Sequence, residues 1–190
     1  MDTKNFLTFL LFCWIAFFAY WAIKAPSAKK TVERQSLSQR FIVTASLVLS
    51  FIILEGAVPV AALNIRLIPE TAAWGIIGCV VCAVGLAVAI WARYTLGTNW
   101  SGIVTFKENH ELITNGPYAY VRHPIYTGLL LMIIGTGLVF GRANGLVAFV
   151  VCLAGFWYKL SIEEKLMTKH FPDTYPAYKK KVKALIPFVL

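Results

Sequence analysis

Charged residues are scarce in this chain of 190 amino acids, at 14%, against about a quarter in soluble domains. Acidic residues are the scarcest, since nine Asp and Glu stand against eighteen Lys and Arg and leave a formal net charge of +9. Hydrophobic residues make up 58% of the chain, and the mean hydropathy is +0.68. Because the basic residues gather in three hydrophilic segments, the pattern argues against a nucleic-acid-binding protein and indicates a polytopic membrane protein.

Cysteine is also rare, and its placement gives no disulfide or metal pattern. All four cysteines lie inside apolar stretches (Cys13, Cys79, Cys82 and Cys152). Cys79 and Cys82 spell C-x-x-C, but the βαβ pattern that accompanies the redox motif is missing. On a helix both thiols would pack as small hydrophobic groups. We predict no metal site and no redox role for this pair.

The first apolar stretch lacks the features of a cleaved signal peptide. Lys4 is offset by Asp2, and lysines follow the stretch in place of a small-residue cleavage site. We therefore expect a retained helix and an all-α bundle of five transmembrane segments, over residues 6–23, 41–63, 74–92, 127–140 and 146–160. Glu55 in the second stretch is an intramembrane carboxyl and so a functional-site candidate. Pro59 indicates that the helix kinks or surfaces nearby, which favours a structural place for Glu55 near the interface. The last two stretches are short and flank a turn at 141–145, which predicts a helical hairpin.

Lys and Arg placement predicts the orientation in the membrane. Fifteen of the eighteen lie in the segments 24–40 and 93–122 and in the tail from 159, and three lie on the other side. The positive-inside rule then places the N-terminus outside and the C-terminal tail in the cytoplasm. Glycines in the third and fourth stretches predict close helix packing in lipid (Gly75, Gly78, Gly85, Gly128, Gly135 and Gly137).

The sequence NGPYAYVRHPIYTG at residues 115–128 carries the first polar cluster. Pro124 suits the first turn of the fourth helix. Arg122 and His123 would then stand beside unpaired backbone N–H groups at the positive helix end, where an anion binds well. A helix start with interface tyrosines and a positive-inside arginine is the alternative that composition alone favours.

Two further clusters lie on the same predicted face. Glu163 follows Lys159 by four residues, so both share one helical face, with Glu164 beside them. A hairpin would bring these carboxylates to Arg122 and His123, an arrangement that suits a zwitterion. A solvated, charged helix end is the alternative. Asn99, Trp100 and Ser101 form the third cluster.

These residues together resemble the isoprenylcysteine carboxyl methyltransferase family of integral-membrane enzymes, within a broader group that includes phospholipid and thiol methyltransferases. The matching segments are HELITNGPYAYVRHPIY at 110–126, the paired glutamates at 163 and 164 with the tail that follows, and LGTNWS at 96–101. The resemblance covers about residues 90–190. The first two stretches show little beyond hydrophobicity.

The resemblance implies S-adenosylmethionine as methyl donor, in a cytoplasmic pocket closed by the tail. Its carboxylate would meet His123 and the helix start, with Arg122 in support, and its ammonium and ribose would meet Glu163 or Glu164. An aromatic ring could face the sulfonium. The implied donor-binding residues are His110, Leu112, Ile113, Gly116, Tyr118, Arg122, His123, Pro124, Tyr126, Glu163 and Glu164, and Lys159, Asn99 and Glu163 are the implied catalytic residues.

The acceptor is less constrained by the sequence. Family members acting on a prenylcysteine carboxylate usually carry arginine where this chain has Lys159. Lysine offers a point charge, whereas the arginine guanidinium can bind both oxygens of a carboxylate. We expect a lipophilic acceptor, most simply a prenylcysteine-like carboxylate, with a thiol or a phospholipid amine as alternatives. An NADPH-dependent enzyme similar to sterol reductases and a non-enzymatic membrane protein are the competing functions.

The domain organisation and location follow from the same features. We expect one integral-membrane domain over 1–190, with two N-terminal spans in 1–70 and the catalytic core in 71–190. The bilayer and a lipophilic or lipidated acceptor are the expected partners, without nucleic acid, and the oligomeric state stays open. The size, the basic face and the missing disulfide spacing are compatible with a prokaryotic inner membrane.

Overall fold

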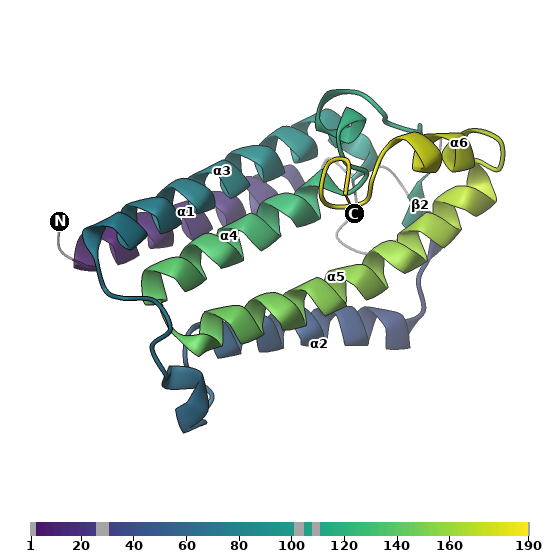
Figure 1. The fold of residues 1–190 in the computed structure, drawn as a ribbon. Helices are drawn as coiled ribbons and strands as arrows, with labels where there is room; N and C mark the ends of the chain where they lie inside the picture. Colours follow the sequence, from purple (N-terminus) through teal and green to yellow (C-terminus); the bar gives the residue numbers. More distant parts are fainter. Residues whose placement is uncertain (1–2, 26–30, 101–104, 108–110, 190) are drawn as a thin grey trace.

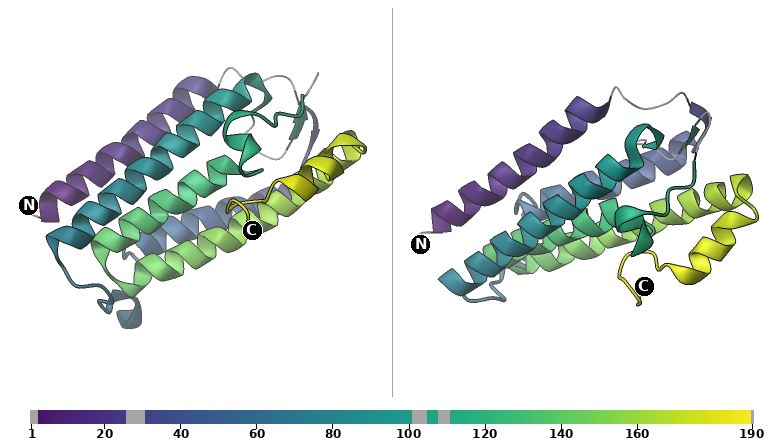
Figure 2. Two further views of the ribbon diagram at one scale, coloured as in Figure 1. Left: turned by 45° about the horizontal axis from the view of Figure 1, so that its top comes forward. Right: turned by 90° about the horizontal axis from the view of Figure 1, so that it is seen from above.

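The computed structural model describes residues 3–25, 31–100, 105–107 and 111–189 and shows a bundle of long helices (Figure 1). The long helices are α1 (Thr3–Lys24), α2 (Leu37–Leu54), α3 (Ala72–Leu96), α4 (Pro124–Phe140) and α5 (Ala143–His170). Short 3-10 turns are η2 (Ala61–Asn64), η3 (Gly97–Asn99) and η4 (Gly116–Ala119), and α6 (Thr174–Lys181) precedes the C-terminus. The bundle axes run roughly alongside one another in all three views (Figure 2).

Most of the bundle is suited to a membrane. Among the described residues, four helices are long and apolar enough to cross a bilayer, namely α1, α2, α3 and α5. Helix α4 has 17 residues and is shorter than the other apolar helices. Many large apolar side chains on α1, α2 and α3 are exposed, such as Phe12, Phe41 and Ile76, which suits contact with lipid.

Glycines bring α3 and α4 into backbone contact. A Cβ atom on Gly85 would lie 2.5 Å from the carbonyl oxygen of Gly128, and one on Gly135 would lie 2.5 Å from the backbone nitrogen of Cys82. No side chain fits such a gap, so the predicted close packing at these glycines is confirmed. Cys82 is fully buried in this interface and, like the other cysteines, forms no disulfide.

The hairpin of the last two long helices is confirmed, but its bounds differ from the prediction. The turn is short, since α4 ends at Phe140 and α5 begins at Ala143, with Gly141 in the left-handed region at φ 65°. Helix α5 starts earlier than predicted and continues ten residues beyond Leu160 to His170. Hydrophobicity alone gave too short a span, because the last turns of α5 carry the charged residues of the candidate site.

The predicted end of the second helix is wrong. This helix ends at Leu54, nine residues earlier than expected, with exposed Glu55 as its C-cap and Pro59 beyond it. The all-α fold class is confirmed, with one small sheet in addition. Strands β1 (Thr31–Arg34) and β2 (Thr105–Lys107) form a small antiparallel sheet that joins the segments after α1 and α3. Three- and four-residue strands give no periodic signal in the sequence.

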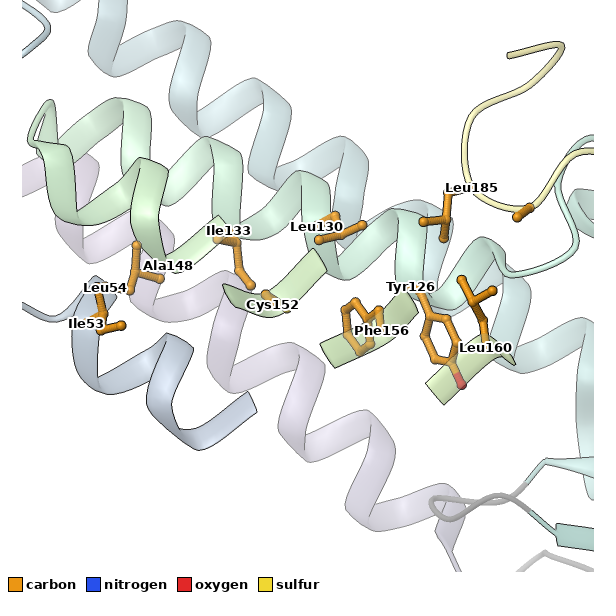
Figure 3. Packing of buried hydrophobic residues seen from close by; sticks show 11 residues of the cluster. Ile53, Leu54, Tyr126, Leu130, Ile133, Ala148, Cys152, Phe156, Leu160 and Leu185 are labelled. Atoms are coloured by element: carbon orange, nitrogen blue, oxygen red, sulfur yellow. The ribbon is translucent and has the colours of Figure 1, made fainter. Parts of the chain in front are cut away.

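The main hydrophobic core lies between α2, α4, α5 and the C-terminal segment (Figure 3). Leu54 and Ile133 are almost fully buried in it. Towards the other end of the core the rings of Tyr126 and Phe156 stack, with centroids 4.6 Å apart and planes 9° apart. Leu185 from the segment after α6 packs into the same core, so the chain end is part of the folded unit.

Candidate active site

A cavity of about 390 Å³ lies where α4 begins and the late turns of α5 pass, within the size range of small-molecule sites. Every long helix contributes to its wall. Its polar end is formed by His123 and Tyr126 with Lys159 and Glu163 of α5, and α6 adds Tyr175 and Tyr178.

His123 joins the two carboxylates at the polar end. Its Nδ1 lies 3.4 Å from Glu163 Oε2, and its Nε2 lies 3.4 Å from Glu164 Oε1. The hydroxyl of Tyr126 donates to Glu163 Oε1 at 2.6 Å. The predicted convergence of the segment around 122–126 with the paired glutamates is therefore confirmed in space.

Glu164 does not border the cavity and binds the basic groups around it. Arg122 donates to its Oε1 from Nε at 2.9 Å and from Nη2 at 2.5 Å, and Lys179 Nζ lies 2.6 Å from Oε2. The carboxylate is 7% exposed and is absent from the cavity wall, which Glu163 joins. The two neighbouring glutamates thus have different surroundings, which their adjacency in the sequence does not reveal.

Pro124 occupies the first helical turn as predicted, but the backbone N–H groups of Arg122 and His123 are already paired. The N–H of Arg122 donates to Lys183 O at 2.8 Å, and that of His123 donates to Ala184 O at 3.0 Å. The C-terminal segment supplies these carbonyls. These two N–H groups are therefore not available to an anion.

Lys159 is 9% exposed and borders the cavity one helical turn before Glu163. Its Nζ lies 5.2 Å from the centroid of the Tyr126 ring, within reach of a cation–π contact. The imidazole of His123 stacks on the same ring, with centroids 5.4 Å apart. Tyr126 therefore orders both cationic side chains and Glu163.

The apolar wall comes from helices that the sequence did not implicate. Phe17, Phe18 and Trp21 of α1 and Leu47 of α2 border the cavity, and the rings of Phe17 and Trp21 stack at 4.0 Å. Their spacing on α1 is compatible with one helical face, but every apolar span offers such faces. Only the fold shows which face meets the polar end.

The role of Arg93 was also not indicated by the sequence. It is 1% exposed, and its Nη1 and Nη2 donate to Gly97 O and Lys24 O, each at 2.7 Å. Its guanidinium carbon lies 4.3 Å from the ring centroid of Trp100, which borders the cavity with Asn99. Arg93 therefore ties the end of α1 to the loop that carries this part of the wall.

Some of the remaining predicted site residues border the cavity, and others do not. Leu112, Ile113 and Tyr118 border the cavity. Gly116 adopts φ +57°, does not border the cavity, and has Thr95 Oγ1 3.2 Å from the place that a Cβ atom would take. Pro124 is buried behind the wall, and His110 and Ser101 lie outside the described residues.

The surroundings shift the pKa values of several of these groups. Burial by itself lowers the pKa of His123, but the hydrogen bonds and charges of Glu163 and Glu164 outweigh it, so the pKa is raised. Burial raises the pKa of Tyr178 to about 12 and also raises that of Tyr118. Both phenols therefore stay neutral, and Tyr178 donates to Tyr118 O at 2.5 Å.

A family model described as phospholipid methyltransferase matches residues 74–174, more than half of the chain. The chain belongs to the phospholipid methyltransferase family. The match runs from α3 into the first residue of α6 and so covers the polar end of the cavity. The apolar wall on α1 and α2 lies outside it.

Curated relatives agree with this assignment to the phospholipid methyltransferase family. Protein-S-isoprenylcysteine O-methyltransferase of Schizosaccharomyces pombe is 38% identical over 101 residues, 52% of this chain and 43% of the relative. The Saccharomyces cerevisiae protein of the same name is 34% identical over 117 residues, 60% of this chain and 49% of the relative. The chain therefore spans about half the length of these relatives.

A solved structure extends the likeness beyond the family match. The eukaryotic intramembrane Ras methyltransferase ICMT (isoprenylcysteine carboxyl methyltransferase) superposes with a TM-score of 0.60 at 26% identity, over 97% of this chain and 66% of that one. The resemblance read from the residues is confirmed, and the chain is an integral membrane protein of this helical fold.

Proposed function

We propose that this chain is a membrane-embedded methyltransferase that uses S-adenosylmethionine and a lipophilic acceptor with a prenylcysteine-like carboxylate. One observation carries the proposal. The wall of a single cavity includes both His123, Lys159 and Glu163 and the aromatic side chains of α1. A zwitterionic donor suits the polar part of this wall, and a lipid chain suits its aromatic part.

The residues at the polar end fit the donor in charge and shape. Glu163 offers a partly buried carboxylate for an ammonium or for ribose hydroxyls, and His123 offers a cationic partner for a carboxylate. Leu112 and Ile113 add an apolar edge that suits adenine, and the rings of Tyr118, Tyr126 and Trp100 suit a sulfonium. When bound, S-adenosylmethionine would supply a methyl group activated by its sulfonium.

Lys159 favours an anionic acceptor. Its ammonium group is almost buried beside the cavity, so it would attract a carboxylate and repel a protonated amine. A carboxylate is already ionised near pH 7 and needs no general base, whereas an amine needs one. Asn99 is buried in the wall and would orient the acceptor. A thiol acceptor stays the alternative, because a nearby ammonium also favours a thiolate.

The chain's main task in this reaction is positioning and the exclusion of water. The stacked rings of His123, Tyr126 and Phe156 hold the polar end, and Tyr175 and Tyr178 of α6 cover it. We assign donor contacts to His123 and Glu163 and an acceptor contact to Lys159. Arg122 also borders the cavity, and its ion pair with Glu164 helps to hold α6 and His123 in place.

We further infer five crossings, with the N-terminus outside and the cavity on the cytoplasmic side. Helix α4 spans about 26 Å at 1.5 Å per residue, enough for a nearly complete crossing. The α1 and α2 residues in the cavity wall support one functional unit over 1–190, although 71–190 holds the donor end. A prokaryotic inner membrane stays a prediction.

Two measurements test the function. Purified protein should bind S-adenosylhomocysteine by isothermal titration calorimetry and should transfer labelled methyl groups to a prenylcysteine. Fatty acids, phospholipids and lipophilic thiols serve as competing acceptors in the same assay. Absent binding of either donor form, with saturable binding of NADPH, would overturn the proposal in favour of a reductase.

A further inference from the structure

The C-terminal strap, residues 182–189, lies against the start of α4 in an irregular conformation (Figure 1). Leu185 belongs to the core cluster that includes Leu130 of α4 (Figure 3), and its carbonyl accepts from Thr127 in the first turn of α4, so the strap reaches the depth of the membrane helices. Irregular backbone at such a depth requires protein partners for its polar groups.

The strap meets this requirement at five consecutive carbonyl groups. Arg122 donates from its side chain to Val182 O and from its backbone to Lys183 O. His123 N donates to Ala184 O at 3.0 Å, and Thr127 Oγ1 donates to Leu185 O at 2.7 Å. Val189 N then closes a turn on Ile186 O at 3.1 Å.

The strap's outer side chains are apolar and face away from the protein. Ile186 is 50% exposed, Phe188 89% and Val189 71%. An aqueous location would leave three large apolar groups in water next to each other. Exposed aromatic residues on neighbouring segments, Trp91 and Tyr120, are of the type that marks a membrane–water boundary.

Lysines precede this apolar end. Lys180, Lys181 and Lys183 are exposed, and residues 174–189 contain no acidic residue. Lys179 differs from them because it pairs with Glu164. A basic cluster followed by exposed apolar residues suits a bilayer surface with anionic headgroups.

We propose that the strap binds an anionic bilayer surface, with Ile186, Phe188 and Val189 among the acyl chains and the three lysines on lipid phosphates, and that this contact closes the donor pocket. The contacts of the strap explain how lipid binding would affect the donor pocket. The strap holds the backbone of Arg122 and His123, and α6 just before it carries Tyr175 and Tyr178 of the cavity wall. The lipid contact is independent of the proposed function, whereas its effect on donor affinity rests on it.

The experiment compares nanodiscs of phosphatidylcholine alone with discs that also contain phosphatidylglycerol. Anionic discs should protect Lys180, Lys181 and Lys183 from trypsin and should tighten S-adenosylhomocysteine binding by about fivefold or more, a usual size of coupling between sites. The triple variant K180Q/K181Q/K183Q should lose the gain in affinity. The matched control K165Q/K169Q removes charge from exposed residues of α5 and should keep it.

A second variant, F188S/V189S, removes two of the apolar side chains proposed to enter the bilayer. It should also lose the gain in S-adenosylhomocysteine affinity. Equal trypsin cleavage and equal affinity in both discs would overturn the proposal, and protection without a change in affinity would overturn the coupling. Absent donor binding in every disc would overturn the proposed function, while trypsin protection would still decide the lipid contact.

Discussion

The imidazole of His123 lies between the carboxylates of Glu163 and Glu164, at 3.4 Å from each. The two contacts use opposite ring nitrogens, so both carboxylates are paired at once only when the ring is protonated. One side chain thereby links the group that faces the cavity to the ion pair that holds the tail.

Replacing His123 by alanine should weaken S-adenosylhomocysteine binding by about tenfold or more, since a charge-assisted bond of about 1.5–3 kcal/mol is lost. Calorimetric titration measures the effect. The control His170→Ala removes an imidazole at the end of α5, away from the cavity wall. Equal affinities for both variants would remove His123 from the donor site.

The raised pKa of His123 predicts a pH dependence of stability. Its folded-state pKa exceeds the ordinary value of about 6.5, so protonation stabilises the fold fully below about pH 6.5 and is lost as pH rises through the folded-state value. The melting temperature relative to His123→Gln should therefore fall over this range. A constant difference between the two proteins would contradict the prediction.

Glu163→Gln and Glu164→Gln form a matched pair at adjacent positions. Glu164→Gln leaves Arg122 without its buried partner, and breaking such a pair costs about 3–5 kcal/mol. This variant should melt earlier and also bind the donor about tenfold more weakly, because the tail loosens. Glu163→Gln should weaken donor binding with a smaller loss of stability. Thermal unfolding and titration on both variants separate these effects.

Lys159→Ala should lower turnover with a prenylcysteine acceptor and leave donor affinity nearly unchanged. Lys159→Arg restores a charge and adds a bidentate fork for a carboxylate, so it should keep or raise turnover. Labelled methyl transfer and calorimetry give the two readouts. Unchanged turnover in Lys159→Ala would remove this residue from the acceptor site.

Leucine at Gly85 should prevent the close contact of α3 with α4, because even a Cβ atom would approach Gly128 O to 2.5 Å. We expect a loss of at least about 3 kcal/mol or failure to fold, at the upper end of overpacking costs. Leucine at Ala87, an exposed position on the same helix, is the control and should be tolerated. Retained stability of Gly85→Leu would mean that the helices pack differently.

The polar end of the site could be predicted from the sequence, because charged side chains stand out in an apolar chain. Arg122, His123 and Glu163 were found this way, and the hairpin followed from Gly141. The partners of the backbone at 122 and 123 could not, since carbonyl groups of a tail some sixty residues away leave no trace in composition.

The apolar wall escaped prediction for a different reason. Phe17 and Trp21 have the same character as the lipid-facing residues around them, so only three-dimensional packing distinguishes them. The sheet of β1 and β2 and the full length of α5 were missed because short strands and a charged helix end carry weak periodic signals.

Arg93 holds the end of α1 through a hydrogen bond to the main-chain carbonyl oxygen of Lys24. Every amino acid offers this oxygen, so this hydrogen bond does not depend on which side chain stands at position 24. Under the proposed function, the cavity-lining side chains of α1 could therefore differ without loss of this contact. Such a difference would change the lipid acceptor and leave the donor-binding residues of α4 and α5 as they are.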